Sequence, residues 1–120
     1  YKGLYRVLME KRIKSAILLV IGALDKLRLG YYDIVTRNYV VVEKEGMFEL
    51  TSGIGNVALD EEGQVMIHLH IVAQNSERVT YSGHVLDGCR VGVTVEYVIF
   101  ELDEILKRKF NEDVGLKLLE

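Results

Sequence analysis

The chain has 120 residues and a mass of 13.7 kDa, the size of one domain with a single hydrophobic core. Apolar residues make up 49% of it and charged residues 28%, which excludes disordered and fibrous proteins. The net charge of −3 argues against a domain built to hold duplex DNA by itself, since such domains are basic, and we expect weak or no direct nucleic-acid binding.

The first expected elements are a helix and two strands. From Tyr1 to about Arg12 apolar residues recur at helical spacing, which predicts an amphipathic helix. The stretch "SAILLVIGA" (residues 15–23) is almost continuously apolar, as expected for a strand covered on both faces, and Gly22 is expected to interrupt it. Alternation of side-chain types from Leu27 to Asp33 indicates a second strand.

The middle of the chain predicts an antiparallel meander. Residues 38–72 have strand composition, with Glu45-Gly46 and Glu62-Gly63 as turn signals. The triplet "NSE" (residues 75–77) predicts the next turn, "RVTYSGHVL" (residues 78–86) a strand and "DGC" (residues 87–89) another turn. A long β-rich run follows, from residue 90 to residue 102.

The tail, residues 103–120, is expected to begin as a short helix and to lose its pattern at residues 111–115. No internal repeat or linker divides the chain, so residues 1–120 are expected to form a single domain. The pattern predicts an α+β fold: about six strands, mostly antiparallel, with one main N-terminal helix packed against the sheet.

Location is predicted from the apolar runs and the cysteine count. The longest apolar run, Ser15–Leu24, has about half of the ~20 residues that span a bilayer. No secretory leader pattern opens the chain. Cys89 is the only cysteine, so no internal disulfide can form. We expect a cytoplasmic protein without a membrane partner.

All three histidines lie within seventeen residues, His68, His70 and His84. In a strand, residues i and i+2 share a face, so His68 and His70 are neighbours there. The opposite face carries only aliphatic residues, Val65, Ile67, Leu69 and Ile71, and is expected to be the core side. The "NSE" turn returns His84 toward the other two imidazoles.

Three histidines on adjacent strands suit a zinc site that keeps its fourth position open. An alternative interpretation is two histidines on a half-exposed strand face and a third in a loop, each satisfied by backbone or solvent. Cys89 is a candidate fourth ligand, but a lone buried cysteine acting as a small apolar side chain is the simpler interpretation.

Several motifs in a fixed order resemble one known family. They are "GALDKLRLGYYD", "GMFELTSGIGNVAL", "HLHIV", "SGHVLDGCRVGVTVEYVIFEL" and the tail "LKRKFNEDVGLKLLE". Together, from about Ser15 to Glu120, they resemble the PPC domain, the "plants and prokaryotes conserved" domain. This domain follows AT-hooks in plant nuclear proteins and stands alone in bacteria and archaea. The retained histidines are similar to those of the stand-alone prokaryotic type.

The resemblance implies a homotrimer, a zinc ion held by His68, His70 and His84, and a fold similar to that of acetolactate decarboxylase, which also uses a three-histidine metal. The chain departs from the family pattern in two ways. Family members generally have a strand before the first helix, which is not expected here, and the AT-hook is missing because the chain contains no proline. The missing AT-hook weakens any inherited role in direct DNA binding.

Two functions follow as hypotheses. The first is a trimeric PPC protein with a three-histidine zinc site, grouped by family with DNA-associated proteins. The second is a zinc-dependent enzyme that acts on a small carbonyl or carboxylate substrate, and such a small molecule would then be its ligand. Glu96 is the candidate acid or base for that chemistry, although a glutamate on an exposed strand face needs no such role.

Overall fold

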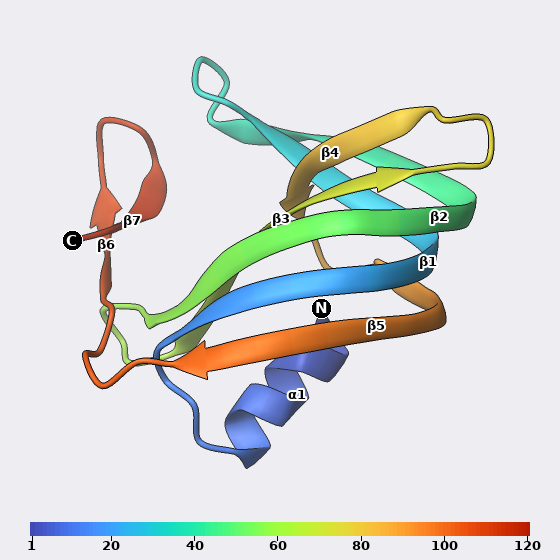
Figure 1. The fold of residues 1–120 in the computed structure, drawn as a ribbon. Helices are drawn as coiled ribbons and strands as arrows, with labels where there is room; N and C mark the ends of the chain where they lie inside the picture. The colour runs from blue at the N-terminus through green and yellow to red at the C-terminus, as the bar shows by residue number, and fades with distance from the viewer.

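A computed structural model describes residues 1–120, and its α+β fold confirms the predicted class (Figure 1). One helix precedes seven strands. In chain order the elements are α1 (Lys2–Glu10), β1 (Ala16–Asp33), β2 (Asn38–Leu59), β3 (Val65–Gln74), β4 (Thr80–Val85), β5 (Arg90–Glu101), β6 (Arg108–Asn111) and β7 (Leu116–Leu119).

The main sheet has five antiparallel strands and closes on itself. Its order is β2-β3-β4-β1-β5, and β1 also pairs with β2. Strand β1 can have three partners because β2 pairs along one of its edges and β5 and β4 share the other edge. The first half pairs with β5, from Ala16 opposite Glu101, and the second half pairs with β4 at Leu29 and Gly30. The resulting ring of β1 to β4 brings β3 and β4 side by side.

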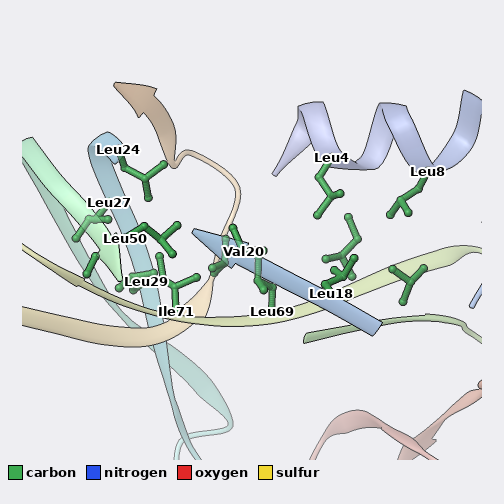
Figure 2. Packing of buried hydrophobic residues seen from close by; sticks show 14 of the residues in the cluster. Leu4, Leu8, Leu18, Val20, Leu24, Leu27, Leu29, Leu50, Leu69 and Ile71 are labelled. Carbon is green, nitrogen blue, oxygen red and sulfur yellow. The ribbon is translucent and has the colours of Figure 1, made fainter. Parts of the chain in front are cut away.

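The core lies between the concave face of the sheet and α1. Leu4 and Leu8 of the helix are buried against the first half of β1, where Leu18 and Val20 point toward them (Figure 2). The helix is amphipathic, as its spacing predicts. No side chain caps its N-terminus, so burial of its apolar face is what stabilises it. Ile67, Leu69 and Ile71 of β3 complete the same core.

The prediction that the first half of β1 is covered on both faces is wrong for the single chain. Ile17, Leu19 and Ile21 are 42%, 40% and 53% exposed, whereas the alternate residues are buried. The helix covers only one face of the sheet, so the other face of β1 presents aliphatic side chains outward.

Two glycines that were expected to end strands lie inside them. Gly22 has φ 146° and Gly46 has φ 118°. The pairing of β1 with β2 shifts between Val20 and Gly22 and again between Leu24 and Lys26. Both glycines therefore sit at irregularities that bend continuous strands, as β-bulges do. The turns predicted at residues 62–63, 75–77 and 87–89 are present.

The tail forms a hairpin, β6–β7, and the short helix predicted there is wrong. The residues where the helical pattern is lost are its turn. The Asn111 side chain accepts hydrogen bonds from the backbone N–H of Asp113 and Val114, and Gly115 has φ 74°. Pairing of β6 with β7 gives the backbone N–H and C=O groups of this segment the hydrogen bonds that a helix would otherwise have supplied.

The hairpin is attached to the main sheet near its base and at its turn. At the base, Lys117 makes ion pairs of 2.9 Å with Asp60 and 2.8 Å with Glu62. At the turn, the Tyr32 hydroxyl donates to the backbone carbonyl of Val114 at 2.5 Å. The helical part of the fold lacks the length and the apolar character that a membrane-spanning helix requires.

Candidate metal centre

The three histidines come together on the outer face of the sheet. His68 and His70 alternate along β3 with buried Ile67 and Leu69, as the sequence predicts. His84 on β4 lies directly opposite His70 in the β3–β4 register. Residues opposite each other on paired strands share a face, so the antiparallel return places the third imidazole beside the first two.

Their ring nitrogens converge. The Nε2 atoms of His68 and His70 are 3.0 Å apart, and one nitrogen from each of the three rings lies within 4.8 Å of the others. Ligand atoms on a tetrahedral zinc ion with Zn–N bonds of ~2.1 Å are ~3.4 Å apart. The cluster therefore needs only small ring rotations to hold one ion.

A glycine on β2 allows the backbone to approach the cluster closely. A Cβ added to Gly55 would lie 2.2 Å from the carbonyl oxygen of His68, which no real side chain could tolerate. Any other residue at this position would push β2 away from β3 and displace the strand that carries His68 and His70.

Three further side chains surround the histidines. The Tyr39 ring stacks on His84 with centroids 5.0 Å apart. Arg108 of β6 donates through Nη2 to the Asn56 side-chain oxygen at 2.8 Å and contacts His68 Nδ1 at 3.1 Å. Asn56 lies opposite His68 in the β2–β3 register. The cluster itself contains no carboxylate.

Burial keeps two of the imidazoles in their neutral form. It is the main cause that lowers the pKa of His84 to about 4, and the other imidazoles and Arg108 add to the effect. Burial likewise lowers the pKa of His68, followed by the charge of Arg108. Neutral imidazole is the form that binds metal, so both rings are ready to act as ligands at neutral pH.

Two buried polar atoms near the cluster have no hydrogen-bond partner, His84 Nδ1 and Arg108 Nε. A buried nitrogen without a partner costs free energy. Coordination of a cation by His84 Nδ1 would give that atom a partner. This is a second reason, besides the spacing of the rings, that the three histidines fit a metal ion.

An open hollow of about 650 Å³ adjoins the cluster. His68, His70 and Asn56 form its polar side, and its apolar side is formed by Ile17, Ile54, Leu102 and Leu106. A mostly apolar hollow with a few convergent polar groups is the usual form of a small-molecule site.

Glu96 and Cys89, the other residues singled out in the sequence, lie elsewhere. Glu96 is exposed on β5 opposite Ile21. Strand β5 pairs with β1 and not with β3 or β4, and Glu96 is not among the clustered ligand atoms. Cys89 is not among the clustered ligand atoms.

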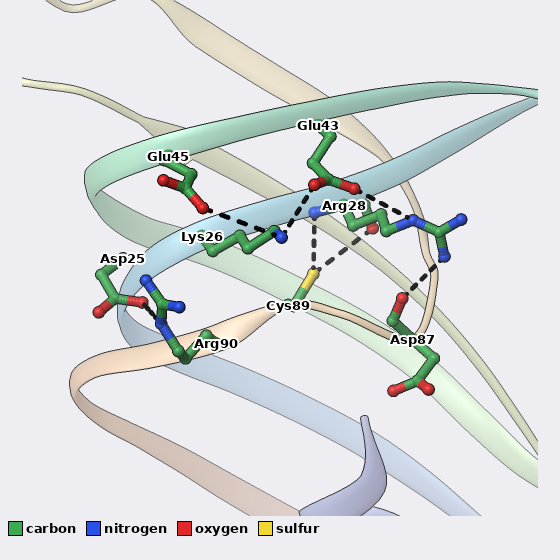
Figure 3. A network of polar contacts seen from close by, with 8 residues as sticks. All are labelled: Asp25, Lys26, Arg28, Glu43, Glu45, Asp87, Cys89 and Arg90. Carbon is green, nitrogen blue, oxygen red and sulfur yellow. Dashed lines mark hydrogen bonds and ion pairs between the residues drawn. The ribbon is translucent and has the colours of Figure 1, made fainter.

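Cys89 instead belongs to a network of polar contacts near the β4–β5 turn (Figure 3). Its sulfur accepts a hydrogen bond from the Arg28 N–H at 3.3 Å and contacts the Arg28 carbonyl oxygen at 3.4 Å. Burial is the main cause that raises the pKa of the Cys89 thiol. The thiol is therefore protonated at neutral pH and acts as part of the fold.

Tyr39, Asn56 and Arg108 are not identified as site residues by the sequence analysis. Tyr39 and Asn56 both lie on β2, and Arg108 lies on β6. The pairing of β2 with β3 places Asn56 opposite His68, and the position of the β6–β7 hairpin brings Arg108 to His68. Tyr39 reaches His84 by way of β1, because Tyr32 pairs with Tyr39 and Gly30 pairs with His84.

Comparison with known proteins gives one family and several solved structures. Residues 1–103 match the sequence model of the Plants and Prokaryotes Conserved (PCC) domain, the family introduced above as PPC. A search of curated proteins found no match.

Three solved structures are similar over 99% of this chain. A candidate DNA-binding protein from Bacteroides thetaiotaomicron has a TM-score of 0.90 and 28% identity, with 82% of that chain covered. A metal-containing protein from Archaeoglobus fulgidus has a TM-score of 0.88 and 28% identity, with 83% covered. A plant- and prokaryote-conserved (PPC) protein from Pyrococcus horikoshii has a TM-score of 0.88 and 29% identity, with 81% covered.

Proposed function

The chain belongs to the Plants and Prokaryotes Conserved domain family, and from this premise we propose that it is a homotrimeric protein that binds one zinc ion per chain through His68, His70 and His84. The observation that carries the metal site is the convergence of three ring nitrogens within 4.8 Å, one ring having a buried Nδ1 without a partner. The similar protein from Archaeoglobus fulgidus, described as metal-containing, supports it.

Zinc is the preferred ion because of the donor set. Three imidazoles with no carboxylate suit zinc better than magnesium or calcium, which require oxygen ligands. Three protein ligands also leave a fourth position for water or a small molecule. A zinc ion held there would supply Lewis acidity, which polarises a carbonyl group or activates water.

Metal content and thermal unfolding test the site. We expect about one zinc per chain in protein purified without chelators, and a melting temperature that rises when zinc is added to metal-free protein. His70→Ala should lose most of the zinc and keep the metal-free melting temperature, because the core face of β3 is unchanged. Wild-type protein that neither contains nor binds zinc would refute the metal site.

The trimer is supported by the outer face of the sheet. Ile17 lies opposite Phe100, and Leu19 lies opposite both Val98 and Ile54 in the strand registers. These five side chains are between 40% and 62% exposed and form one apolar patch. Contiguous apolar patches of this kind mark protein interfaces, and the family resemblance implies that the partner is a second and third copy.

Sedimentation equilibrium tests this proposal, and we expect three times the chain mass at micromolar concentration. Val98→Lys, which puts a charge in the patch, should give monomers. Val35→Lys is the matched control, because Val35 is 88% exposed and lies outside the patch. A monomer mass for the wild-type protein would contradict the proposal.

The proposed role in DNA binding is indirect. The similar Bacteroides protein is a candidate DNA-binding protein, but this chain has a net charge of −3. We expect only weak duplex binding that fades with salt, measured by fluorescence anisotropy. A sequence-specific nanomolar complex at physiological salt would contradict this expectation.

The hollow beside the histidines favours a second function, a zinc-dependent enzyme for a small carbonyl or carboxylate compound. Apolar side chains line it next to His68 and His70, so a small molecule bound there would lie beside two of the proposed metal ligands. Cobalt-substituted protein tests the idea, because its visible spectrum should change when pyruvate or acetate is added and His70→Ala should abolish the change. An unchanged spectrum at millimolar concentrations counts against this second function.

A further inference from the structure

Arg108 is the one side chain through which the C-terminal hairpin reaches the histidine cluster. Its Nη1 donates to the Lys117 carbonyl oxygen at 3.0 Å within the hairpin. Its Nη2 faces the sheet, 2.8 Å from Asn56 Oδ1 and 3.1 Å from His68 Nδ1. The guanidinium therefore links β6, β7, β2 and β3 at one point.

The charge of Arg108 has no counter-ion. Its side chain is buried with 6% exposure, and none of the ion pairs in the structure involves it. A buried cation without a carboxylate is costly and depends on its hydrogen-bond acceptors. His68 Nδ1 is one of the two acceptors of Nη2, so the metal-free cluster helps to satisfy Arg108.

The contact with Arg108 fixes the proton on His68. Guanidinium only donates hydrogen bonds, so His68 Nδ1 must accept and carries no proton. The proton of the neutral ring is therefore on Nε2, which points at His70 Nε2 only 3.0 Å away. Hydrogen bonds then run in one direction, from Arg108 to His68 and from His68 to His70.

This arrangement is the reverse of what a metal-bound histidine requires. A metal at His68 Nε2 replaces the proton there, and the ring stays neutral only if Nδ1 takes up a proton from solvent. Nδ1–H then needs an acceptor, but it faces a donor. Ligation through Nδ1 is also blocked, because a metal ~2.1 Å from that atom would occupy the place of Arg108 Nη2.

We infer that Arg108 competes with the metal for His68, so that metal binding must break the contact between the two residues. This inference rests on the proposed zinc site. Its consequence is a lower metal affinity than three histidines alone would give, since the contact must be broken and a fixed positive charge stays near the ion. The site is then suited to reversible metal exchange.

Nitrogen-15 NMR of the imidazoles at pH 8 tests the contact directly, with His68→Gln used to assign the His68 signals. In metal-free protein we expect an unprotonated Nδ1 and a protonated Nε2 on His68. In zinc-loaded protein we expect the proton on Nδ1. A protonated Nδ1 in metal-free wild-type protein would overturn the inference.

Zinc competition titrations with a chromophoric chelator test the consequence. Arg108→Gln offers an amide oxygen to the Nδ1–H of zinc-bound His68. It should bind zinc about tenfold more tightly, because zinc no longer has to break the charge-assisted hydrogen bond from Arg108. Arg108→Met, which removes charge and donor alone, should change the affinity in the same direction. Lys109→Met is the control, because it removes one positive charge from the neighbouring, exposed position of β6 and Lys109 takes part in none of the ion pairs.

The sign of the change decides the matter. Weaker zinc binding by both Arg108 variants, with Lys109→Met unchanged, would show that Arg108 supports the site and would overturn the inference. If wild-type protein binds no zinc, the proposed zinc-binding function is wrong. The inference that Arg108 competes with the metal for His68 is then supported only if Arg108→Gln does bind zinc. Failure of that variant to bind would overturn the inference as well.

Discussion

Two polar clusters on this small sheet differ in how their charges are balanced. In the network near the β4–β5 turn, Glu43 lies between Lys26 at 2.8 Å and Arg28 at 3.3 Å, and Arg90 pairs with Asp25 at 2.6 Å (Figure 3). The histidine cluster has a buried cation, Arg108, with no carboxylate partner, and two buried nitrogens without any partner.

The difference separates polar groups that serve the fold from those that await a ligand. The ion pairs of the first cluster are complete within the chain: those of Glu43 join β2 to β1, and that of Arg90 with Asp25 joins the start of β5 to β1. The second cluster leaves hydrogen-bonding capacity unused in a buried place, which a stable fold normally avoids. A buried nitrogen without a partner on one of three converging imidazoles is therefore the stronger indication of a binding site.

The largest expected effect is stabilisation by zinc, and it should depend on the histidine cluster alone. Free zinc at a thousand times its dissociation constant should raise the free energy of unfolding by about 4 kcal/mol, measured by chemical denaturation of metal-free and loaded protein. Glu43→Gln, in the ion-pair cluster, should keep the whole effect. An equal loss in Glu43→Gln and His70→Ala would break the distinction between the clusters.

The next effect is on the acid side of neutrality. Burial lowers the pKa of His84 to about 4 in the folded chain from the ordinary histidine value of 6.5, so between these values the unfolded state binds more protons. The stability of metal-free protein should therefore fall as pH decreases from about 6.5 to about 4. His84→Gln should flatten this slope in denaturation curves measured across that range, leaving only the part due to His68.

The ion-pair cluster responds to acid in a different range. Hydrogen bonding and charge from Lys26 lower the pKa of Glu43 below the ordinary glutamate value of 4.5. Its contribution is present above that value and is lost as pH falls below it. If the slope of stability against pH between pH 6.5 and pH 4 is unchanged in His84→Gln, His84 is not the cause of the acid sensitivity in this range. The proposed difference between the two clusters would then be wrong.

Much of the sheet could be predicted from local patterns. Alternation along β3 separates Ile67 and Leu69 from His68 and His70 correctly, because the side-chain period of a strand is fixed at two residues. The errors concern tertiary context. Gly22 and Gly46 resemble strand ends in the sequence, but bulges keep β1 and β2 continuous, and the outward exposure of Ile17 depends on which face α1 covers.

The candidate site was predictable only in part. One turn joins the strands that carry His70 and His84, so their proximity follows from local signals. Arg108 is 40 residues from His68 along the chain, and its segment was expected to be helical. No local pattern could place its guanidinium beside an imidazole, because that contact depends on the position of the whole β6–β7 hairpin.

A smaller effect is expected from Cys89→Ala. The thiol is partly buried and contacts both backbone polar atoms of Arg28, so its loss should cost about 1 kcal/mol of stability. Zinc binding should be unchanged, because the sulfur is not among the clustered ligand atoms. Loss of zinc in this variant would instead identify Cys89 as a fourth ligand and would join the two clusters into one site.

The smallest effect is expected from the exposed ion pair between Lys26 and Glu43. Both side chains contact solvent, and such pairs contribute little because water and salt screen them. A double-mutant cycle with Lys26→Met and Glu43→Gln should give a weakly favourable coupling energy that disappears in 1 M salt, where the Debye length is about 3 Å. Zinc affinity of all three variants should equal that of wild-type protein. A coupling that persists at high salt would show that this pair is shielded from solvent in the assembled protein, as burial of the neighbouring surface by another copy of the chain would cause.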